Sequence, residues 1–461
     1  MLEIDMNEFP IADYVPYFTG VSTDSRTVKK GDCFFAIAGK KFDGHDYIAD
    51  VFAKGAICAV VQKDIDKEKF PGKCILKVDD TIQALGDLAR EYRKKAGYRV
   101  VAITGSVGKT TTRQIIYHVL SRNFRVHQSP NSFNNNIGVP LTFLDAQDGT
   151  QIVVAELGTN HPGEIAYLTR IAAPDIAVVT NIHPAHLEGF GDLEAIAKEK
   201  MSICEGLLPG GTIIINSDFE PLADFCRRKK INFMSFGKSP NSDSVAGSIR
   251  FHGLSSSFTI DGMQVELPLP GPGNVENALA AWAVCKLFGL SAQDFAKAVK
   301  TFSGTKMRAE VIQIGTLTIV NDCYNANPAS MKNALEILAN IDPSQKHRLV
   351  FICGDMAELG SHSEILHVEL GEEIAKANIN LMLAVGRLSK IAARAAKKKS
   401  KNDLQIKYFE DTLSACNKLH EFIKDYDIIL VKGSRTAGLE AAVDKLKGLS
   451  YFGCGCAARH V

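Results

Sequence analysis

One segment, residues 99–121 (RVVAITGSVGKTTTRQIIYHVLS), constrains the fold of this chain more than any other. An apolar, β-branched run from Val100 to Thr104 ends at Gly105, and Lys109-Thr110 then opens a stretch whose apolar residues have helical spacing. A strand, a glycine-bearing turn and a Lys-Thr pair at a helix start form the layout of a phosphate site, because backbone N–H groups there face phosphate oxygens. The segment therefore predicts an α/β sheet that binds ATP, with the lysine on the terminal phosphates and the threonine on Mg²⁺.

This loop departs from the common spacing, since Ile103 stands where a glycine five residues before Gly108 is usual. A tight strand-to-helix turn that carries Lys-Thr by chance is the alternative. The flanking pattern favours the phosphate site. We expect the following residues to contact ATP: Gly105, Ser106, Val107, Gly108, Lys109, Thr110 and Thr111.

Length and composition indicate a large globular protein without a nucleic-acid or membrane function. A chain of 461 residues is long enough for about three domains. Its formal net charge of +1 leaves no basic footprint for nucleic acid. The acidic N-terminal residues and the absence of an 18-residue apolar run argue against secretion and membrane insertion. Eleven cysteines, most of them within apolar runs, predict reduced thiols and a cytoplasmic location, with Cys454 and Cys456 in a mobile tail rather than a zinc site.

Two composition shifts divide the chain into three α/β domains. A charged run that ends at Gly97 and a Ser-Gly-Thr stretch at 303–305 are the expected boundaries. We therefore expect a small N-terminal α/β domain (1–97), a central doubly wound P-loop ATPase sheet (98–305) and a C-terminal Rossmann-like domain (306–461). Strands are expected near 100–104, 151–155, 176–180, 212–215, 347–353, 381–385 and 427–431, with an antiparallel section at 245–268.

Alternating helices complete the prediction for the last two domains. They are expected near 274–288, 329–340, 363–378 and 411–424. Asn327 can cap the second of these helices, with Pro328 as its first residue.

Several polar residues stand where an open α/β sheet binds its ligands. Glu156 ends a strand, which suits Mg²⁺ ligation, although a lone Glu is often a surface residue. His183 and His186 follow the next strand and can bind metal, transfer protons or cap a loop. Lys200 falls on the apolar face of a helix, where a bare ammonium is costly and must snorkel, pair or be modified, whereas Lys198 points away.

Amide and basic side chains indicate two further contacts. Asn274 and Asn277 lie three residues apart on one helix face, which suits either a nucleobase edge or helix capping. In the last domain, polar loops at 321–328, 354–360 and 432–435 each follow a strand and can converge on one ligand. Lys432 and Arg435 give this edge of the sheet, called the rim below, a positive charge that suits a carboxylate ligand.

These motifs together resemble the Mur ligases, the ATP-dependent amino-acid ligases of peptidoglycan precursor synthesis. The resemblance covers nearly the whole chain and is carried by the order of the motifs: STDSR (22–26), KFDGHDYI (41–48), TGSVGKTTT (104–112), FNNNIGVPLT (133–142), ELGTNHPGEIAYLTRIAAPDIAVVTNIHPAHLEGFG (156–191), NVENALAA (274–281), DCYNANPASM (322–331), GDMAELG (354–360) and KGSR (432–435). His183 and Gly273 depart from the residues usual in the family.

The resemblance implies a role for each matching position. Lys109, Glu156, His186 and Lys200 would be catalytic. The metal ligands would be Thr110, Glu156, His186 and Lys200, the last as a carbamate. Arg308 and Asp322 would join Asn274 and Asn277 on the ATP side. The substrate-binding positions would be Ser25, Arg26, Gly44, His45, Asn134, Asn135, Tyr324, Asn325, Asn327, Lys432, Ser434 and Arg435.

The reaction implied by the family is ligation through an acyl phosphate that ATP and Mg²⁺ generate. Within the family, the YNANP and GDMAELG loops favour addition of D-alanyl-D-alanine to a UDP-N-acetylmuramoyl-tripeptide. We also expect a monomer and a cytoplasmic location. One alternative is the ligase that adds the third amino acid, although its acidic-Asn-Pro-Arg motif is not visible here. Folylpolyglutamate synthetase shares the ATPase core but should lack the N-terminal domain. Outside the enzymes, the alternative is a scaffold protein that senses a nucleotide without catalysing a reaction.

Overall fold

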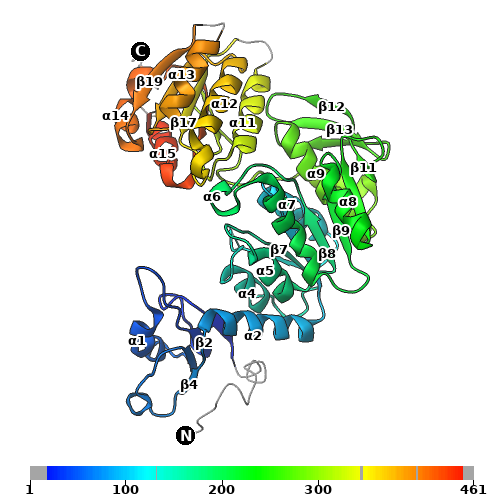
Figure 1. Cartoon of the computed structure of the whole chain (residues 1–461), viewed down its shortest axis with the longest axis vertical. Coiled ribbons are helices and arrows are strands. Elements are labelled where there is room, and N and C mark those ends of the chain that lie inside the picture. The colour runs from blue at the N-terminus through cyan, green and yellow to red at the C-terminus, as the bar shows by residue number, and fades with distance from the viewer. Residues whose placement is uncertain (1–17, 131, 343–345, 401–402, 450–461) are drawn as a thin grey trace, which may run out of the picture. The chain divides into compact units, whose positions relative to one another are not determined.

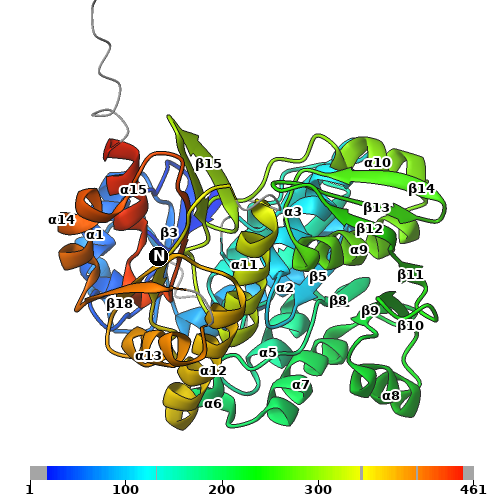
Figure 2. The same ribbon diagram turned by 90° about the horizontal axis from the view of Figure 1, so that it is seen from above.

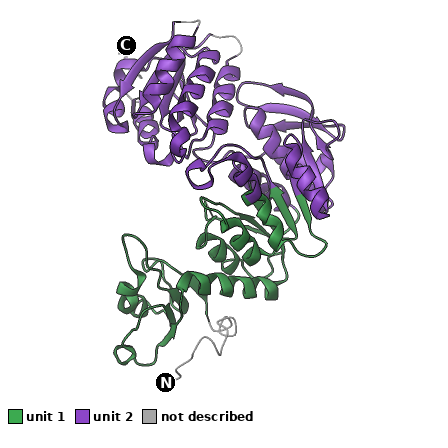
Figure 3. Cartoon of the chain, in the orientation of Figure 1, with its two compact units in different colours: residues 1–104, 123–178, 199–213 green, residues 105–122, 179–198, 214–461 purple. Residues whose placement is uncertain are grey.

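The structure is a computed structural model that describes residues 18–130, 132–342, 346–400 and 403–449 (Figure 1). By its internal contacts the chain divides into two compact units (Figure 3). Unit 1 comprises 1–104, 123–178 and 199–213, and unit 2 comprises 105–122, 179–198 and 214–461. The three-domain division at 97 and 305 stays a prediction.

The N-terminal part of unit 1 is a parallel four-stranded sheet in the order β1-β2-β3-β4, with a helix on each face. Alternate residues of one strand point to opposite faces, so Phe34 packs beside Phe52 of α1 while Phe35 packs beside Leu85 of α2. The elements are β1 (Gly20–Ser22), β2 (Asp32–Phe35), α1 (Ile48–Ala53), β3 (Cys58–Val61), β4 (Cys74–Lys77) and α2 (Thr81–Ala96).

A seven-stranded sheet in the order β11-β10-β9-β8-β5-β7-β6 forms the middle of the chain. Its strands are β5 (Arg99–Thr104), β6 (Val126–Gln128), β7 (Ile152–Glu156), β8 (Ile176–Val179), β9 (Thr212–Asn216), β10 (Phe233–Gly237) and β11 (Ser244–Val245). β5 pairs with β7, and β7 with β6, in parallel, as the doubly wound prediction requires. The predicted antiparallel section is confirmed by β12 (Gly247–Phe251), β13 (Ser256–Ile260) and β14 (Met263–Leu267).

Helices lie between these strands, as expected. They are α3 (Lys109–Leu120), α4 (Gly138–Leu144), α5 (Glu164–Ala172), α6 (Leu187–Phe190), α7 (Leu193–Met201), α8 (Glu220–Lys229), α9 (Pro272–Leu287) and α10 (Ala292–Val299). Of these, α9 matches the helix predicted near 274–288. α3 begins at the lysine of the Lys-Thr pair, so the strand-loop-helix layout expected for a phosphate site is confirmed.

The last sheet has the order β15-β16-β20-β17-β18-β19 and is parallel except for the edge hairpin β15–β16. α14 and α15 pack against one face of it, and α11, α12 and α13 lie on the other (Figure 2). The bounds are β15 (Glu310–Ile314), β16 (Leu317–Asn321), α11 (Pro328–Ile341), β17 (Leu349–Gly354), α12 (Ser363–Lys376), β18 (Leu381–Val385), α13 (Ser389–Lys399), β19 (Gln405–Phe409), α14 (Thr412–Phe422), β20 (Ile428–Lys432) and α15 (Glu440–Leu449). Asn327 caps α11, as predicted, by accepting a hydrogen bond from the Ser330 N–H.

Two composition-based expectations concern the whole chain. None of the nine cysteines in the described ranges forms a disulfide, and Cys454 and Cys456 lie outside those ranges. Among the helices of the described residues, none is long and apolar enough to span a bilayer.

Candidate active site

The loop between β5 and α3, in unit 2, is a cradle made of backbone. Gly105 (φ 142°) and Gly108 (φ 85°) adopt conformations that favour glycine. A Cβ on Gly105 would lie 1.9 Å from Thr180 Oγ1, and one on Gly108 would lie 2.1 Å from Asn277 Oδ1. No side chain fits at either position, so the backbone can approach a phosphate closely at the start of α3.

Residues after β8 hold this loop in place. Thr180 Oγ1 and Asn181 Nδ2 both donate to Val107 O, while the Val107 N–H donates to Asn181 Oδ1 at 2.9 Å. Ser106 Oγ bridges the backbone of His183, donating to its carbonyl and accepting from its N–H. Sequence reasoning assigned no role to Thr180 and Asn181, although both lie inside the 156–191 motif at the end of the predicted strand.

Lys109 lies over the loop, with its Nζ donating to Gly105 O at 2.8 Å. The ring of His183 is half-buried beside the loop, and this burial lowers the pKa of His183 although the charge of Glu276 partly opposes the shift. A neutral imidazole is therefore favoured at this edge of the phosphate loop.

The two asparagines of α9 are buried and face α3. Asn274 Nδ2 donates to Pro270 O at 2.8 Å, and Asn277 Oδ1 accepts from Thr112 Oγ1 at 3.3 Å. The Gly273 N–H donates to Asn333 Oδ1, and a Cβ on Gly273 would lie 2.6 Å from that oxygen. The amides thus brace the helix start, and their predicted contact with adenine stays a prediction.

His186 is the N-cap residue of α6 and has a left-handed conformation, with φ 53°. Its Nδ1 lies 2.5 Å from Glu358 Oε2, a carboxylate in the GDMAELG loop after β17. That loop is itself fixed by the buried His367, whose Nδ1–H donates to Ser363 O and whose Nε2 accepts the Met356 N–H. Burial lowers the pKa of His367, which favours this neutral tautomer.

The positive rim expected from Lys432 is largely neutralised. Lys432 is 1% exposed, and its Nζ lies 2.6 Å from Asp322 Oδ2 and donates to Asn325 O at 2.9 Å. Asp322 Oδ1 also accepts the Ala309 N–H. Lys432 therefore organises the loop after β16, because its charge is matched inside the protein.

Arg435 keeps a largely exposed side chain, and its guanidinium lies 6.0 Å from the centre of the Tyr324 ring. The guanidinium of Arg308 lies 4.2 Å from the same ring. Tyr324 thus lies between Arg308, predicted on the ATP side, and Arg435, predicted to bind substrate. Asn325 Oδ1 accepts the Ala326 N–H, and the Ser434 N–H donates to Asp355 O.

Glu156 ends β7 in unit 1 and is buried. Its Oε1 accepts from Asn134 Nδ2 at 2.9 Å, and the Asn134 carbonyl accepts the Gly158 N–H at 2.7 Å. Asn135 Oδ1 instead accepts the Gly138 N–H at the start of α4. Asn134 is thus placed to orient the Glu156 carboxylate, whereas Asn135 stabilises a helix terminus.

Lys200, also in unit 1, is 2% exposed, whereas Lys198 is exposed, as the helical spacing predicts. The neighbouring Glu199 is buried too, and its carboxylate accepts the N–H groups of Gly163 and Ile165 at the start of α5. Glu199 therefore fixes α7 against α5, a role that the apolar pattern did not reveal.

The N-terminal residues that are predicted to bind substrate differ in what they offer. His45 is buried, donating from Nδ1 to Asp43 Oδ1 and accepting the Gln62 N–H at Nε2. Arg26 is exposed and pairs with Asp24, which lowers the pKa of that carboxyl to about 2. A Cβ on Gly44 would lie 2.7 Å from Ile37 N, so Gly44 allows a tight turn.

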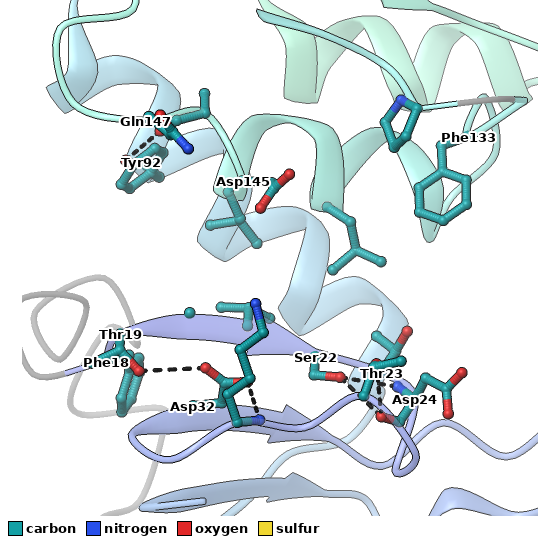
Figure 4. Close-up of a pocket in the computed structure, with 18 of the residues that line it drawn as sticks. Phe18, Thr19, Ser22, Thr23, Asp24, Asp32, Tyr92, Phe133, Asp145 and Gln147 are labelled. Atoms are coloured by element: carbon teal, nitrogen blue, oxygen red, sulfur yellow. Dashed lines mark hydrogen bonds between the residues drawn. The ribbon is translucent and has the colours of Figure 1, made fainter.

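A cavity of about 960 Å³ in unit 1 adjoins the STDSR segment (Figure 4). Ser22, Asp24 and Asp32 line it on the side of β1 and β2, and Phe133 and Asp145 line it from the residues before and after α4. Neither Ser25, Arg26, Gly44 nor His45 lines this cavity. Its carboxylates favour hydroxyl and N–H donors over phosphate. Phe133 opens the FNNNIGVPLT motif, whereas no motif included Asp32.

Comparisons with known proteins agree along the chain. Three family models match: "Mur ligase family, catalytic domain" (17–93), "Mur ligase middle domain" (103–285) and "Mur ligase, glutamate ligase domain" (307–435). The UDP-N-acetylmuramoyl-tripeptide–D-alanyl-D-alanine ligases of Bacillus subtilis and Escherichia coli are each 35% identical, with 93% of both chains covered. A MurF crystal structure from Acinetobacter baumannii is 33% identical, with a TM-score of 0.85 over 93% of both chains. MurF ligase from Thermotoga maritima in complex with ADP is 28% identical, with a TM-score of 0.83 over 95% of this chain and 99% of that one. This chain belongs to the Mur ligase family.

Proposed function

We propose that this protein is the ATP-dependent ligase that joins D-alanyl-D-alanine to UDP-N-acetylmuramoyl-tripeptide in peptidoglycan synthesis. The observation that carries the proposal is the match over 93% of the chain to relatives that bear this name, in sequence and in structure. The backbone cradle at Gly105 and Gly108, together with the ADP complex of the Thermotoga relative, supports ATP as the nucleotide. We further propose three domains (1–97, 98–305 and 306–461), a monomer and a cytoplasmic location.

The reaction proceeds in two steps. The terminal carboxylate of the tripeptide attacks the γ-phosphorus of ATP, which gives an acyl phosphate and ADP. The amine of D-alanyl-D-alanine then attacks the acyl carbon, and phosphate leaves from the tetrahedral intermediate. Lys109 offsets the negative charge that accumulates between carboxylate and phosphates, and Ser106 and the N-terminus of α3 hold those phosphates.

The predicted cation ligands are Thr110, Glu156, His186 and Lys200. A hydroxyl, a carboxylate and an imidazole are suitable donors, whereas the bare ammonium of Lys200 would repel a cation. Carbamylation resolves this conflict: the neutral Nζ amine attacks carbon dioxide, an N–C bond forms, and a proton leaves to solvent. Mg²⁺ held there would stabilise the charge of the reacting carboxylate and phosphates.

The substrate-side residues divide into contacting and supporting groups. We assign the exposed Arg26, the adjacent Ser25 and the cavity lined by Ser22 and Phe133 to the nucleotide substrate. Buried His45 has a supporting role instead, since its ring nitrogens bond to Asp43 and Gln62. We assign Arg435 to the carboxylate of D-alanyl-D-alanine, because its side chain is 60% exposed although it pairs with Glu440 Oε1 at 3.3 Å.

The decisive experiment measures ADP release against a panel of UDP-muramoyl peptides and amino acids. We expect turnover only when the UDP-muramoyl-tripeptide and D-alanyl-D-alanine are both present. Turnover with a UDP-muramoyl-dipeptide and a single amino acid would instead assign the enzyme that adds the third residue. No ADP release with any pair would favour a nucleotide-sensing scaffold.

Lys200 provides an independent test. Lys200→Ala should be folded and nearly inactive, and a small carboxylate supplied in solution should restore part of the activity. The matched control is Lys198→Ala, because Lys198 lies on the exposed face of the same helix. Full activity of an enzyme whose intact mass in bicarbonate shows an unmodified Lys200 would disprove the carbamate.

A further inference from the structure

Two loops that are far apart in the sequence meet at His186 and Glu358. His186 Nδ1 and Glu358 Oε2 are 2.5 Å apart, although 172 residues separate them. The Glu188 N–H also donates to Glu358 O at 3.1 Å. The contact therefore joins the HPAHLEG loop after β8 to the GDMAELG loop after β17 by a side-chain and a backbone interaction.

The backbone at both partners is unusual. His186 (φ 53°) and Glu358 (φ 61°) are non-glycine residues in the left-handed region. Such conformations are costly and persist only where surrounding structure enforces them. Gly360 (φ 56°) follows, and a Cβ there would lie 3.3 Å from Glu188 Cα, so the two backbones approach closely. Left-handed residues in both loops thus lie where the loops touch.

The contact also determines which ring nitrogen can bind a cation. A hydrogen bond to the Glu358 carboxylate requires the proton on Nδ1 of His186, so the lone pair of the neutral ring lies on Nε2. Metal-binding histidines usually donate their other N–H to a carboxylate or carbonyl, which fixes the ring and raises its basicity. Glu358 has no part in the reaction described above.

We propose that Glu358 is a positioning residue that orients His186 toward the active-site cation and couples that site to docking of the GDMAELG loop. The inference rests on the proposed function in one respect, the ligand role of His186. The test separates this role from the opposite one, in which the carboxylate holds the imidazole away from the cation. The two readings predict changes of opposite sign in cation affinity.

The experiment uses Mn²⁺ as the probe and the full chain with ADP, and measures free Mn²⁺ by electron paramagnetic resonance. Glu358→Ala should weaken Mn²⁺ binding by about tenfold or more, as loss of such supporting partners commonly does. Glu358→Gln retains an acceptor oxygen and should fall between the wild type and Glu358→Ala. Glu369→Ala, an exposed acid on α12, is the matched control and should bind Mn²⁺ like the wild type.

His186→Ala separates failure of this inference from failure of the proposed function. We expect His186→Ala to weaken Mn²⁺ binding and Glu358→Ala to add nothing in that background, because one would act through the other. If Glu358→Ala alone binds Mn²⁺ as well as or better than the wild type, while His186→Ala weakens it, the inference is wrong and the ligand role stands. If His186→Ala leaves Mn²⁺ binding unchanged, the ligand role itself fails, and the inference fails with it. Melting curves check folding, which we expect to persist because the Glu358 side chain is half exposed.

Discussion

The buried ion pair between Lys432 and Asp322 allows a stability prediction with a magnitude. Lys432 Nζ lies 2.6 Å from Asp322 Oδ2 and also donates to Asn325 O. The perturbation is Lys432→Met, which keeps an unbranched apolar side chain in the core and removes the ammonium. Asp322 would then retain the Ala309 N–H as its remaining identified hydrogen-bond donor at the carboxylate.

The magnitude follows from burial. Removing one partner of a buried pair costs about 3–5 kcal/mol, because the other charge is left unmatched. The Lys432 side chain is almost completely buried, but that of Asp322 is 16% exposed, so water relieves part of the penalty. We therefore expect the Lys432→Met substitution to lower the free energy of opening this part of the fold by about 3 kcal/mol. At a tenfold change per 1.4 kcal/mol, amide protection should decrease by roughly a hundredfold.

Hydrogen exchange of the intact chain, followed by mass spectrometry, measures this loss in peptides that cover β16, β20 and residues 322–327. The control is Lys376→Met, because Lys376 and Glu373 are also 2.6 Å apart but the lysine is exposed. No change is expected there, since water screens the pair. Asp322→Asn should restore part of the protection lost in Lys432→Met. If Lys432→Met and Lys376→Met are indistinguishable, the reasoning from burial is refuted.

Three further predictions concern the phosphate loop and His367. Lys109→Ala should lower kcat by about a hundredfold or more, whereas an unchanged kcat with a raised KM for ATP would show that Lys109 contributes uniform binding instead. Gly108→Ala should abolish ADP binding in calorimetry because its Cβ would meet Asn277, whereas Gly163→Ala, at a similar φ with open space around it, should bind ADP normally. The pKa of His367 is lowered in the folded state. Below pH about 6.5 the unfolded chain therefore takes up a proton that the native state does not bind. The urea concentration at the unfolding midpoint should consequently decrease as the pH is lowered below this value. His367→Gln should reduce that slope, and an unchanged slope would show that other groups dominate it.

Local patterns in the sequence were sufficient to predict most of the fold. The β-branched run before Gly105 and the helical spacing after Lys109 became β5 and α3, and Asn327-Pro328 begins α11 as expected. Each of these signals depends on residues within one or two turns of each other. Steric and hydrogen-bonding preferences of short segments therefore determine them without knowledge of the rest of the chain.

The partners of the polar groups could not be predicted in this way. Lys432 is 110 residues from Asp322 in the sequence, and His186 is 172 residues from Glu358. A loop sequence indicates that a basic group stands at a strand end, but not which of several acids along the same edge will neutralise it. The sequence thus predicted a positive rim at Lys432, and the fold instead places an ion pair there.

Glu199 and Lys200 show where the limit of periodicity lies. Helical spacing found Lys200, because a buried stripe of apolar residues passes through its position. The same spacing could not find Glu199, which is buried because the N-terminus of α5 supplies two N–H donors to its carboxylate. The helical spacing of apolar residues reveals which face of a helix is turned toward the core. Whether a charge on that helix is tolerated there depends on another element, and that information resides in the tertiary contact alone.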